Sequence, residues 1–486
     1  MIPDLQNPSR DTLLMLLVFF IGAVFNYVYN IAMGWMLSPA QYGILGVAIS
    51  FLLILSLFIT AAFPLTVAKF LSEGGDDSIK HRVFKSSLTG NLFIALIVSF
   101  FFYASYASGL LRLDSTYLPF ILLIVLALIF SSAGGVYASA LQGMFRFKKY
   151  GLINIITTFA KLFSAVLLVM FGLGAVGAFF GMVAGPIAGL LLGVLLTSDF
   201  KFWKAKGWAS RSMYTFALPM FFGMFFMTLL TNLDILGVKF LSESASSDTL
   251  TGYYRSAHIL AELPVFVVGA LMGAMFPYIS RYSSSNYSNK TLKYTVLMIC
   301  PLSIILFVIP SSMVALVFPD SYAAAADALG VLALGLGLFV IITALSGIFQ
   351  AMRHPRVPAI VLTFSTLIEV IALIFLVPGY GILGAAVSTT IACAAGVLGL
   401  GGVYLKNGFF RFDYINTIKT LLGFVLLGVF AYIFPHNTRF LTVLDLLLSA
   451  GLYVSFLFIF GLLNKDDVSM ILSGFNLDKR KLWRKT

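Results

Sequence analysis

The sequence predicts an all-α polytopic membrane protein with fourteen transmembrane helices, organised as two six-helix lobes related by a pseudo-twofold axis, plus two C-terminal helices. Two observations predict this class. Of the 486 residues, 60% are hydrophobic and only 10% are charged, whereas soluble domains carry about 25% charged residues. The apolar residues also come in repeated runs of about 20, the length that a helix needs to cross the hydrocarbon layer. A soluble enzyme, a disulfide-stabilised secreted scaffold and a disordered chain are therefore excluded.

The apolar runs define the expected spans in chain order. The first lobe comprises 13–37, 43–65, 87–108, 118–141, 151–172 and 176–198. The second comprises 214–240, 256–279, 294–318, 328–349, 358–377 and 381–404, and the spans 418–434 and 441–462 follow it. Because the number of spans is even, both termini are expected on the same side of the membrane.

Basic residues set the orientation. If the N-terminus is cytoplasmic, 26 of the 31 Lys and Arg residues fall in inner segments or at inner helix ends, four fall outside, and Lys161 lies within a span. This asymmetry follows the positive-inside rule. It predicts a multi-pass protein of the cell membrane with both termini in the cytoplasm. The net charge of +12 therefore faces the anionic inner leaflet, and nucleic acid is not an expected partner.

The chain also repeats itself at an offset of about 208 residues. Residues 140–144 read Ala-Leu-Gln-Gly-Met, and residues 348–352 read Ile-Phe-Gln-Ala-Met. Each segment is followed by basic residues, a helix, a glycine-containing turn and a second helix rich in small residues. An even number of spans per repeat predicts parallel repeats around a central cavity, a transporter architecture.

The repeat sets the expected domain boundaries. These are an N-terminal lobe at 1–198, an interfacial cytoplasmic linker at 199–213, a C-terminal lobe at 214–405, helices 13 and 14 within 406–464, and a basic cytoplasmic tail at 465–486.

Ionisable residues within spans cost roughly 2.5–3.5 kcal/mol on insertion scales, so each needs a partner or an aqueous cavity. Lys161 lies mid-span, and its counterpart at offset 208 is Glu369. One interpretation is that Lys161 attracts an anionic headgroup while Glu369 carries a coupled proton or cation. The alternative is a structural ion pair or interhelical hydrogen bonding.

Further candidates lie in the first, seventh and eighth spans. Asn26 and Asn30 are one turn apart and suit sugar hydroxyls, or they join helices by hydrogen bonds. Arg255 offers a planar fork for phosphate oxygens, or it extends to the outer interface. Glu262 is a candidate for ion coupling. Asp234 is a candidate for gating, through an ion pair with Lys239 or Arg255, or it simply pairs at a helix end.

No cofactor or metal site is expected. Cys300 and Cys393 both lie in apolar runs, which indicates small buried side chains rather than a disulfide or metal ligands. We find no nucleophile–base arrangement, HExxH motif or P-loop, so the sequence does not indicate an enzyme. Without an ATP-binding motif, an H⁺ or Na⁺ gradient, the membrane potential or product removal must drive transport.

Several short motifs carry a family resemblance. They are residues 37–43 (LSPAQYG), 69–74 (KFLSEG), the turns at Gln142-Gly143 and Gln350-Ala351, and the motifs at 232–234 (NLD), 252–254 (GYY) and 384–386 (GAA). In order and spacing, the chain resembles polysaccharide-biosynthesis flippases, the O-antigen-type branch of the multidrug/oligosaccharidyl-lipid/polysaccharide (MOP) exporter superfamily.

The resemblance implies a flippase that moves a polyprenyl-(pyro)phosphate-linked oligosaccharide from the inner to the outer leaflet by alternating access. It implies that helices 1, 2, 7 and 8 line the headgroup cavity and that helices 13 and 14 help to accommodate the lipid tail. Expected partners are the lipid-linked glycan, membrane lipids, and a glycan polymerase or glycosyltransferases. Two alternatives remain: a cation-coupled multidrug extruder of the same superfamily, and a non-transporting scaffold for glycan-assembly enzymes.

Overall fold

The computed structural model describes residues 8–60, 63–72, 77–199, 222–243, 246–265, 285–352, 354–406, 414–436 and 438–463. The predicted linker beyond Asp199 and the predicted basic tail at 465–486 lie outside the described residues. So do the start of the expected span 214–240 and the end of 256–279.

The chain divides into two compact units, Met1–Lys239 and Phe240–Thr486. The sequence instead predicted lobes at 1–198 and 214–405, and those boundaries stay a prediction. The helices of the first unit are α1 (Pro8–Met36), α2 (Pro39–Thr60), α3 (Phe63–Ser72), α4 (Asp77–Ala107), η1 (Ser115–Tyr117), α5 (Leu118–Gly143), α6 (Phe147–Leu168), η2 (Val169–Leu173) and α7 (Gly174–Leu196). Helix α9 (Leu233–Leu241) crosses the boundary.

The second unit is likewise built from helices. They are α10 (Ser247–Ala261), α12 (Ser285–Val308), α13 (Pro310–Val317), η4 (Asp320–Ala325), α14 (Ala326–Ala351), α15 (Arg356–Lys406), α16 (Tyr414–Ile433) and α17 (Arg439–Ile459).

Every regular element within the described ranges is a helix, and most are apolar enough to cross a membrane. Ten helices meet the length and hydropathy requirements of a span, or eleven if residues 222–229 and 233–241, which meet at a bend of 45°, form one. The predicted class, an all-α polytopic membrane protein, is therefore confirmed. The count of fourteen spans stays a prediction.

Two of these spanning stretches are helical hairpins. Residues 147–196 and 356–406 run for 50 and 51 residues, and a straight helix of that length would measure about 75 Å, more than twice the hydrocarbon thickness. Both turn at a glycine of nearly the same backbone conformation, Gly174 (φ 52°, ψ −140°) and Gly381 (φ 55°, ψ −130°). A hydrogen bond of 3.1 Å from Thr389 Oγ1 to Glu369 Oε1, twenty residues earlier, shows that α15 folds back on itself. The sequence placed both breaks correctly, at 172–176 and 377–381.

Glycines allow the arms of the first hairpin to approach closely. Gly177, Gly181, Gly185, Gly189 and Gly193 recur at every fourth position of α7. A Cβ atom at Gly185 would lie 2.8 Å from the carbonyl oxygen of Thr157 in α6, and one at Gly181 would overlap the carbonyl oxygen of Lys161. Small residues at this spacing let membrane helices pack backbone to backbone. The α6–α7 contact therefore fixes the position of the Lys161 backbone.

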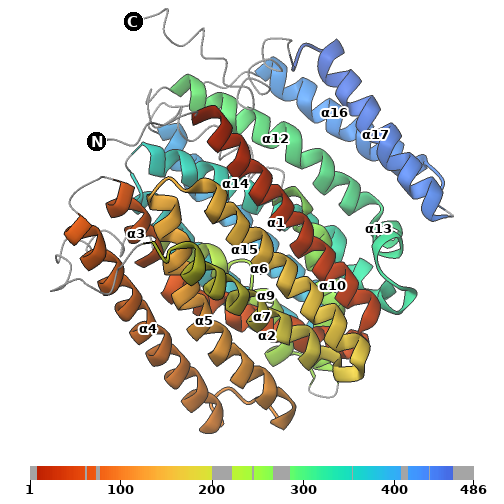
Figure 1. The fold of residues 1–486 in the computed structure, drawn as a ribbon. Coiled ribbons are helices and arrows are strands. Elements are labelled where there is room, and N and C mark those ends of the chain that lie inside the picture. The colour runs from red at the N-terminus through yellow and green to blue at the C-terminus, as the bar shows by residue number, and fades with distance from the viewer. Residues whose placement is uncertain are drawn as a thin grey trace, which may run out of the picture. The chain divides into compact units, whose positions relative to one another are not determined.

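The two C-terminal helices pack within the second unit. Figure 1 shows α16 and α17 (blue) running beside α12 (green). The Tyr453 hydroxyl of α17 donates a 3.0 Å hydrogen bond to the carbonyl oxygen of Leu297 in α12. Lys419 Nζ of α16 donates to the carbonyl oxygen of Phe460, just beyond α17, at 3.3 Å. Helices 13 and 14 of the prediction thus extend the second unit along α12.

Candidate functional site: an intramembrane lysine cluster

Lys161 is the centre of a polar cluster formed by α1 and α6. Its Nζ atom donates a 2.6 Å hydrogen bond to Oδ1 of Asn26, which lies 135 residues earlier in the chain. The same ammonium lies 4.3 Å from the centroid of the Tyr29 ring. Lys161 and Asn26 are both half-buried. The structure therefore brings together two predicted site residues, Asn26 and Lys161, inside the apolar part of one unit.

Hydrogen bonds from neighbouring helices hold the α1 side of this cluster in place. The Tyr29 hydroxyl donates to the carbonyl oxygen of Ala178 in α7 at 3.0 Å, which fixes the ring beneath the ammonium. Asn30 is buried, and its Nδ2 donates to the carbonyl oxygen of Asn26 at 2.8 Å. The Tyr42 hydroxyl donates to the Asn30 carbonyl at 3.2 Å. Asn30 therefore lies behind the cluster rather than at its accessible face.

The cluster pairs a cation with acceptors that leave its charge intact. Asn26 and Tyr29 are neutral, so they solvate the ammonium without neutralising it. An ammonium has three donors, so it can bind phosphate oxygens while keeping a contact to Asn26. A half-buried cation of this kind is able to attract an anionic group, and whether Lys161 does so stays a prediction.

Tyr29 was not singled out from the sequence. The signal was available, because Tyr29 lies three residues after Asn26 on the helical face that also carries Asn30. Two other polar residues of α6 form hydrogen bonds within their own helix. The hydroxyls of Thr158 and Ser164 donate to backbone carbonyls within α6, at 2.7 Å and 2.6 Å.

Glu369 occupies the corresponding place in the second unit. It is fully buried and accepts the hydrogen bond from Thr389 in the opposite arm of the hairpin. At offset 208, Lys161 corresponds to Glu369 and Gly181 corresponds to Thr389. Lys161 and Gly181 are also in contact with each other, through the Lys161 carbonyl oxygen. The two hairpins thus repeat one packing arrangement, with a cation in one and a carboxyl group in the other. Whether these two residues carry transport functions stays a prediction.

The predicted site residues of the eighth span lie on and beside α10. Arg255 is only 5% exposed, and His258 is fully buried. His258 Nδ1 lies 3.4 Å from Oε1 of Glu262, whose side chain is 28% exposed. In this conformation Arg255 is thus packed within the unit instead of extending to an interface, and Glu262 is the more accessible group.

Asp234 lies in the first turn of α9 and is completely buried. Its Oδ1 accepts a 2.8 Å hydrogen bond from the backbone N–H of Ile235. Lys239, one of the two predicted ion-pair partners of Asp234, places its ammonium 4.9 Å from the centroid of the Tyr117 ring. A gating role for Asp234 stays a prediction. Across the described ranges, no cluster of three or more His, Cys, Asp or Glu side chains is placed to hold a metal ion.

One ion pair closes the first hairpin outside the membrane. Arg146 Nη1 lies 2.6 Å from Asp199 Oδ2, which joins the segment between α5 and α6 to the end of α7. The Arg146 guanidinium, by this hydrogen bond and its charge, holds the pKa of Asp199 below its ordinary value. Both side chains are partly exposed, so the pair contributes little to stability.

Comparison with known proteins identifies the family. A profile described as "Polysaccharide biosynthesis protein" matches residues 9–283, more than half of the chain. The chain belongs to the polysaccharide biosynthesis protein family. The cluster of Asn26, Tyr29 and Lys161 lies within the matched region, as do α9 and α10.

One relative is similar to part of the chain. The chain is 24% identical over 299 residues to the probable low-salt glycan biosynthesis flippase Agl15 of Haloferax volcanii, a match that covers 59% of this chain and 61% of the relative. The chain thus spans less than two thirds of the length of that relative.

Solved structures show the same fold. The lipid II flippase MurJ in an inward closed conformation superposes with a TM-score of 0.72 at 17% identity, covering 91% of this chain and 98% of MurJ. An inward-facing MATE-family multidrug transporter of the MOP superfamily superposes with a TM-score of 0.59 at 14% identity, covering 79% of this chain and 94% of the transporter. The fold of this polysaccharide biosynthesis protein is thus shared with MOP-superfamily transporters, as its sequence motifs predicted.

Proposed function

We propose that this protein is a flippase for polyprenyl-(pyro)phosphate-linked oligosaccharides and that it moves them from the inner to the outer leaflet of the cell membrane without changing a covalent bond. One observation carries the proposal: a family member with a MOP-transporter fold holds an ammonium, Lys161, half-buried within a predicted span, where it contacts Asn26 and Tyr29. During flipping, the phosphate group of a lipid-linked glycan must cross the same region of the bilayer.

The proposed mechanism assigns different roles to the two units. Lys161 attracts the phosphate group in the inward-open state, and Asn26 shares its hydrogen bonds with the ammonium and the first sugars. Asn30 supports Asn26 from behind. Arg255 becomes a second phosphate contact when α10 is exposed in another conformation. The polyprenyl tail remains in lipid throughout.

In this proposal, buried or half-buried carboxyl groups couple transport to an ion gradient. Glu369, Glu262 and Asp234 are the proposed carriers of a coupled H⁺ or Na⁺, and the membrane potential contributes about 2.3 kcal/mol per charge moved through 100 mV. Both termini are proposed to be cytoplasmic, so that the C-terminal basic residues face the enzymes of glycan assembly, a glycosyltransferase or polymerase.

A leaflet-accessibility assay tests the proposal. Purified protein is reconstituted in vesicles with a fluorescent polyprenyl-diphosphate oligosaccharide, and exposure of the glycan at the opposite leaflet is followed by an added membrane-impermeant glycosidase. We expect protein-dependent exposure that Lys161→Gln reduces and Lys148→Gln does not. Lys148 is an exposed lysine at the start of the same helix, so this control removes the same charge outside the membrane.

The outcome separates the alternatives. A cation-coupled drug extruder would move fluorescent cations along an ion gradient and leave the lipid-linked glycan in place. A scaffold would move neither substrate in vesicles. The MATE-family structure shares the fold over less of this chain than MurJ does, 79% against 91%, which supports the flippase as the first candidate to test.

A further inference from the structure

A groove between α12 and α16 lies in the second unit, apart from the Lys161 cluster. It has a cavity volume of about 390 Å³ and is lined by eleven residues: Asn289, Lys290, Leu292, Lys293, Val296, Leu297, Asn416, Thr417, Thr420, Leu421 and Phe424. This volume lies at the lower end of the range for ligand pockets, about 300–1,000 Å³. It is too small for an oligosaccharide and suits one compact headgroup with the first part of a chain.

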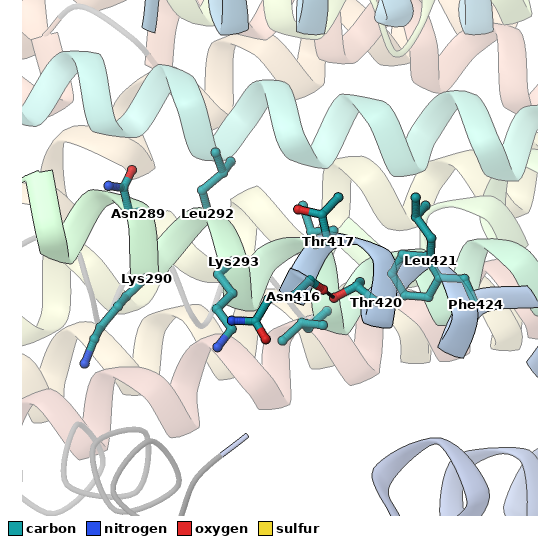
Figure 2. Close-up of a pocket in the computed structure, with 11 residues that line it drawn as sticks. Asn289, Lys290, Leu292, Lys293, Asn416, Thr417, Thr420, Leu421 and Phe424 are labelled. Carbon is teal, nitrogen blue, oxygen red and sulfur yellow. Dashed lines mark hydrogen bonds between the residues drawn. The ribbon is translucent and has the colours of Figure 1, made fainter. Parts of the chain in front are cut away.

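The groove has a polar end and an apolar end. Lys290 and Asn289 lie at one end, and Leu421 and Phe424 lie at the other (Figure 2). The lining spans nine residues of each helix, from 289 to 297 and from 416 to 424, which corresponds to a length of about 12 Å. A lipid has the same order of polarity over the same length, from its headgroup through the glycerol to the first methylenes.

The polar end carries two positive charges. Lys290 and Lys293 are half-buried on α12 and extend to the same side of it (Figure 2). Within the described residues neither ammonium forms an ion pair, and the Lys293 ammonium lies over the Tyr294 ring, 6.0 Å from its centroid. Two uncompensated cations in one groove are complementary to an anion.

Neighbouring hydrogen bonds hold this end of the groove in shape. Asn289 Oδ1 accepts a 2.9 Å hydrogen bond from the Tyr404 hydroxyl of α15. Thr420 Oγ1 donates to the carbonyl oxygen of Asn416 at 2.7 Å. Asn416 and Thr417 also line the groove, and their amide and hydroxyl groups are chemically suited to the ester and glycerol oxygens of a lipid.

Both helices begin at the polar end, and the positive-inside pattern predicts that this end faces the cytoplasm. Anionic lipids are concentrated in the cytoplasmic leaflet, and basic pockets between membrane helices bind their headgroups. We propose that the α12–α16 groove is a binding site for one anionic phospholipid of the inner leaflet, with its phosphate between Lys290 and Lys293 and an acyl chain along Leu421 and Phe424. This lipid would attach α16 and α17 to the rest of the second unit. The proposal does not depend on the flippase function.

Lipid titration by native mass spectrometry tests the proposal on the full-length protein in detergent. The probes are phosphatidylglycerol, phosphatidylcholine, a polyprenyl phosphate and inorganic phosphate. The variants are Lys290→Gln/Lys293→Gln and a matched control, Lys148→Gln/Lys406→Gln, which removes two exposed lysines at the ends of α6 and α15. Thr420→Trp, which fills the middle of the groove, is a third variant.

We expect one phosphatidylglycerol to bind at least about tenfold more tightly than phosphatidylcholine, because two lysines contact its headgroup. Lys290→Gln/Lys293→Gln should weaken phosphatidylglycerol binding by at least about tenfold, while the control pair leaves it within about twofold. Thr420→Trp should weaken the binding of both phosphatidylglycerol and phosphatidylcholine.

Three results would overturn the proposal. One is equal binding of phosphatidylglycerol and phosphatidylcholine. Another is unchanged binding in Lys290→Gln/Lys293→Gln. The third is displacement of phosphatidylglycerol by an equal concentration of polyprenyl phosphate or inorganic phosphate, which would assign the groove to the carrier lipid or to a free anion.

Discussion

Replacing Lys161 by methionine separates a structural role from a transport role. The change removes a hydrogen bond from a charged group, worth about 1.5–3 kcal/mol, and a cation–π contact, worth about 0.5–2 kcal/mol. It also removes the cost of a lysine at the middle of a membrane helix, about 2.5–3.5 kcal/mol. These contributions nearly cancel, so we expect the stability of Lys161→Met to lie within about 2 kcal/mol of the unchanged protein.

Transport should respond differently. If Lys161 binds the phosphate group, its loss should slow glycan flipping at least tenfold, which corresponds to about 1.4 kcal/mol of lost attraction. The assay measures the flipping rate in vesicles together with the thermal unfolding temperature in detergent. Lys161→Arg should retain most activity because it keeps the charge, and Lys148→Gln controls for a charge lost outside the membrane.

The contact to Asn26 provides an internal check. In a double-mutant cycle of unfolding free energies, Lys161→Met and Asn26→Ala should couple by about 0.5–3 kcal/mol, since their side chains share one hydrogen bond. A flipping rate for Lys161→Met equal to that of the unchanged protein would refute the phosphate-binding role. A coupling energy near zero would refute the contact itself.

Three further predictions concern the hairpins. Glu369→Gln should leave unfolding unchanged within about 1 kcal/mol, because an amide oxygen still accepts the buried hydrogen bond, but should abolish the pH or Na⁺ dependence of flipping; an unchanged ion dependence would exclude this residue as the carrier. Gly185→Val should destabilise by about 1–3 kcal/mol, measured by thermal unfolding, because its side chain would overlap the Thr157 carbonyl; wild-type stability would show that α6 and α7 can separate. The pKa of Asp199 is lowered in the folded state, so the stabilisation by Arg146 is present above the unfolded pKa of about 3.9 and is lost as pH falls through the folded pKa. Asp199→Asn should remove this small dependence from melting curves recorded between about pH 3 and 7, and identical pH profiles would contradict it.

Most of the fold was predictable because hydropathy is a local property. An apolar run long enough to span the bilayer must be a helix, since the lipid leaves backbone groups no other partner. The two hairpin turns were equally readable, because Gly174 and Gly381 adopt backbone conformations that other residues avoid. The family was predictable from short motifs spread over the chain, and the profile match at 9–283 confirms it.

The candidate site was only partly predictable. The sequence identified Lys161, Asn26 and Glu369 as polar residues within apolar membrane spans, because the cost of inserting a residue into the membrane depends on residue type and depth alone. It did not show that Lys161 reaches Asn26 and Tyr29, that Arg255 is buried, or that Lys290 shares a groove with α16.

The sequence by itself therefore determined the all-helical membrane class, the two hairpin turns, the repeated sequence motifs and which side chains are costly in the membrane. Only the tertiary structure decided which of those side chains meet and where a cavity remains. The physical reason is that hydrophobicity and backbone preference are set by a few neighbouring residues, whereas contacts such as that between positions 26 and 161 depend on how whole helices pack, and the close α6–α7 approach at Gly181 and Gly185 sets that packing.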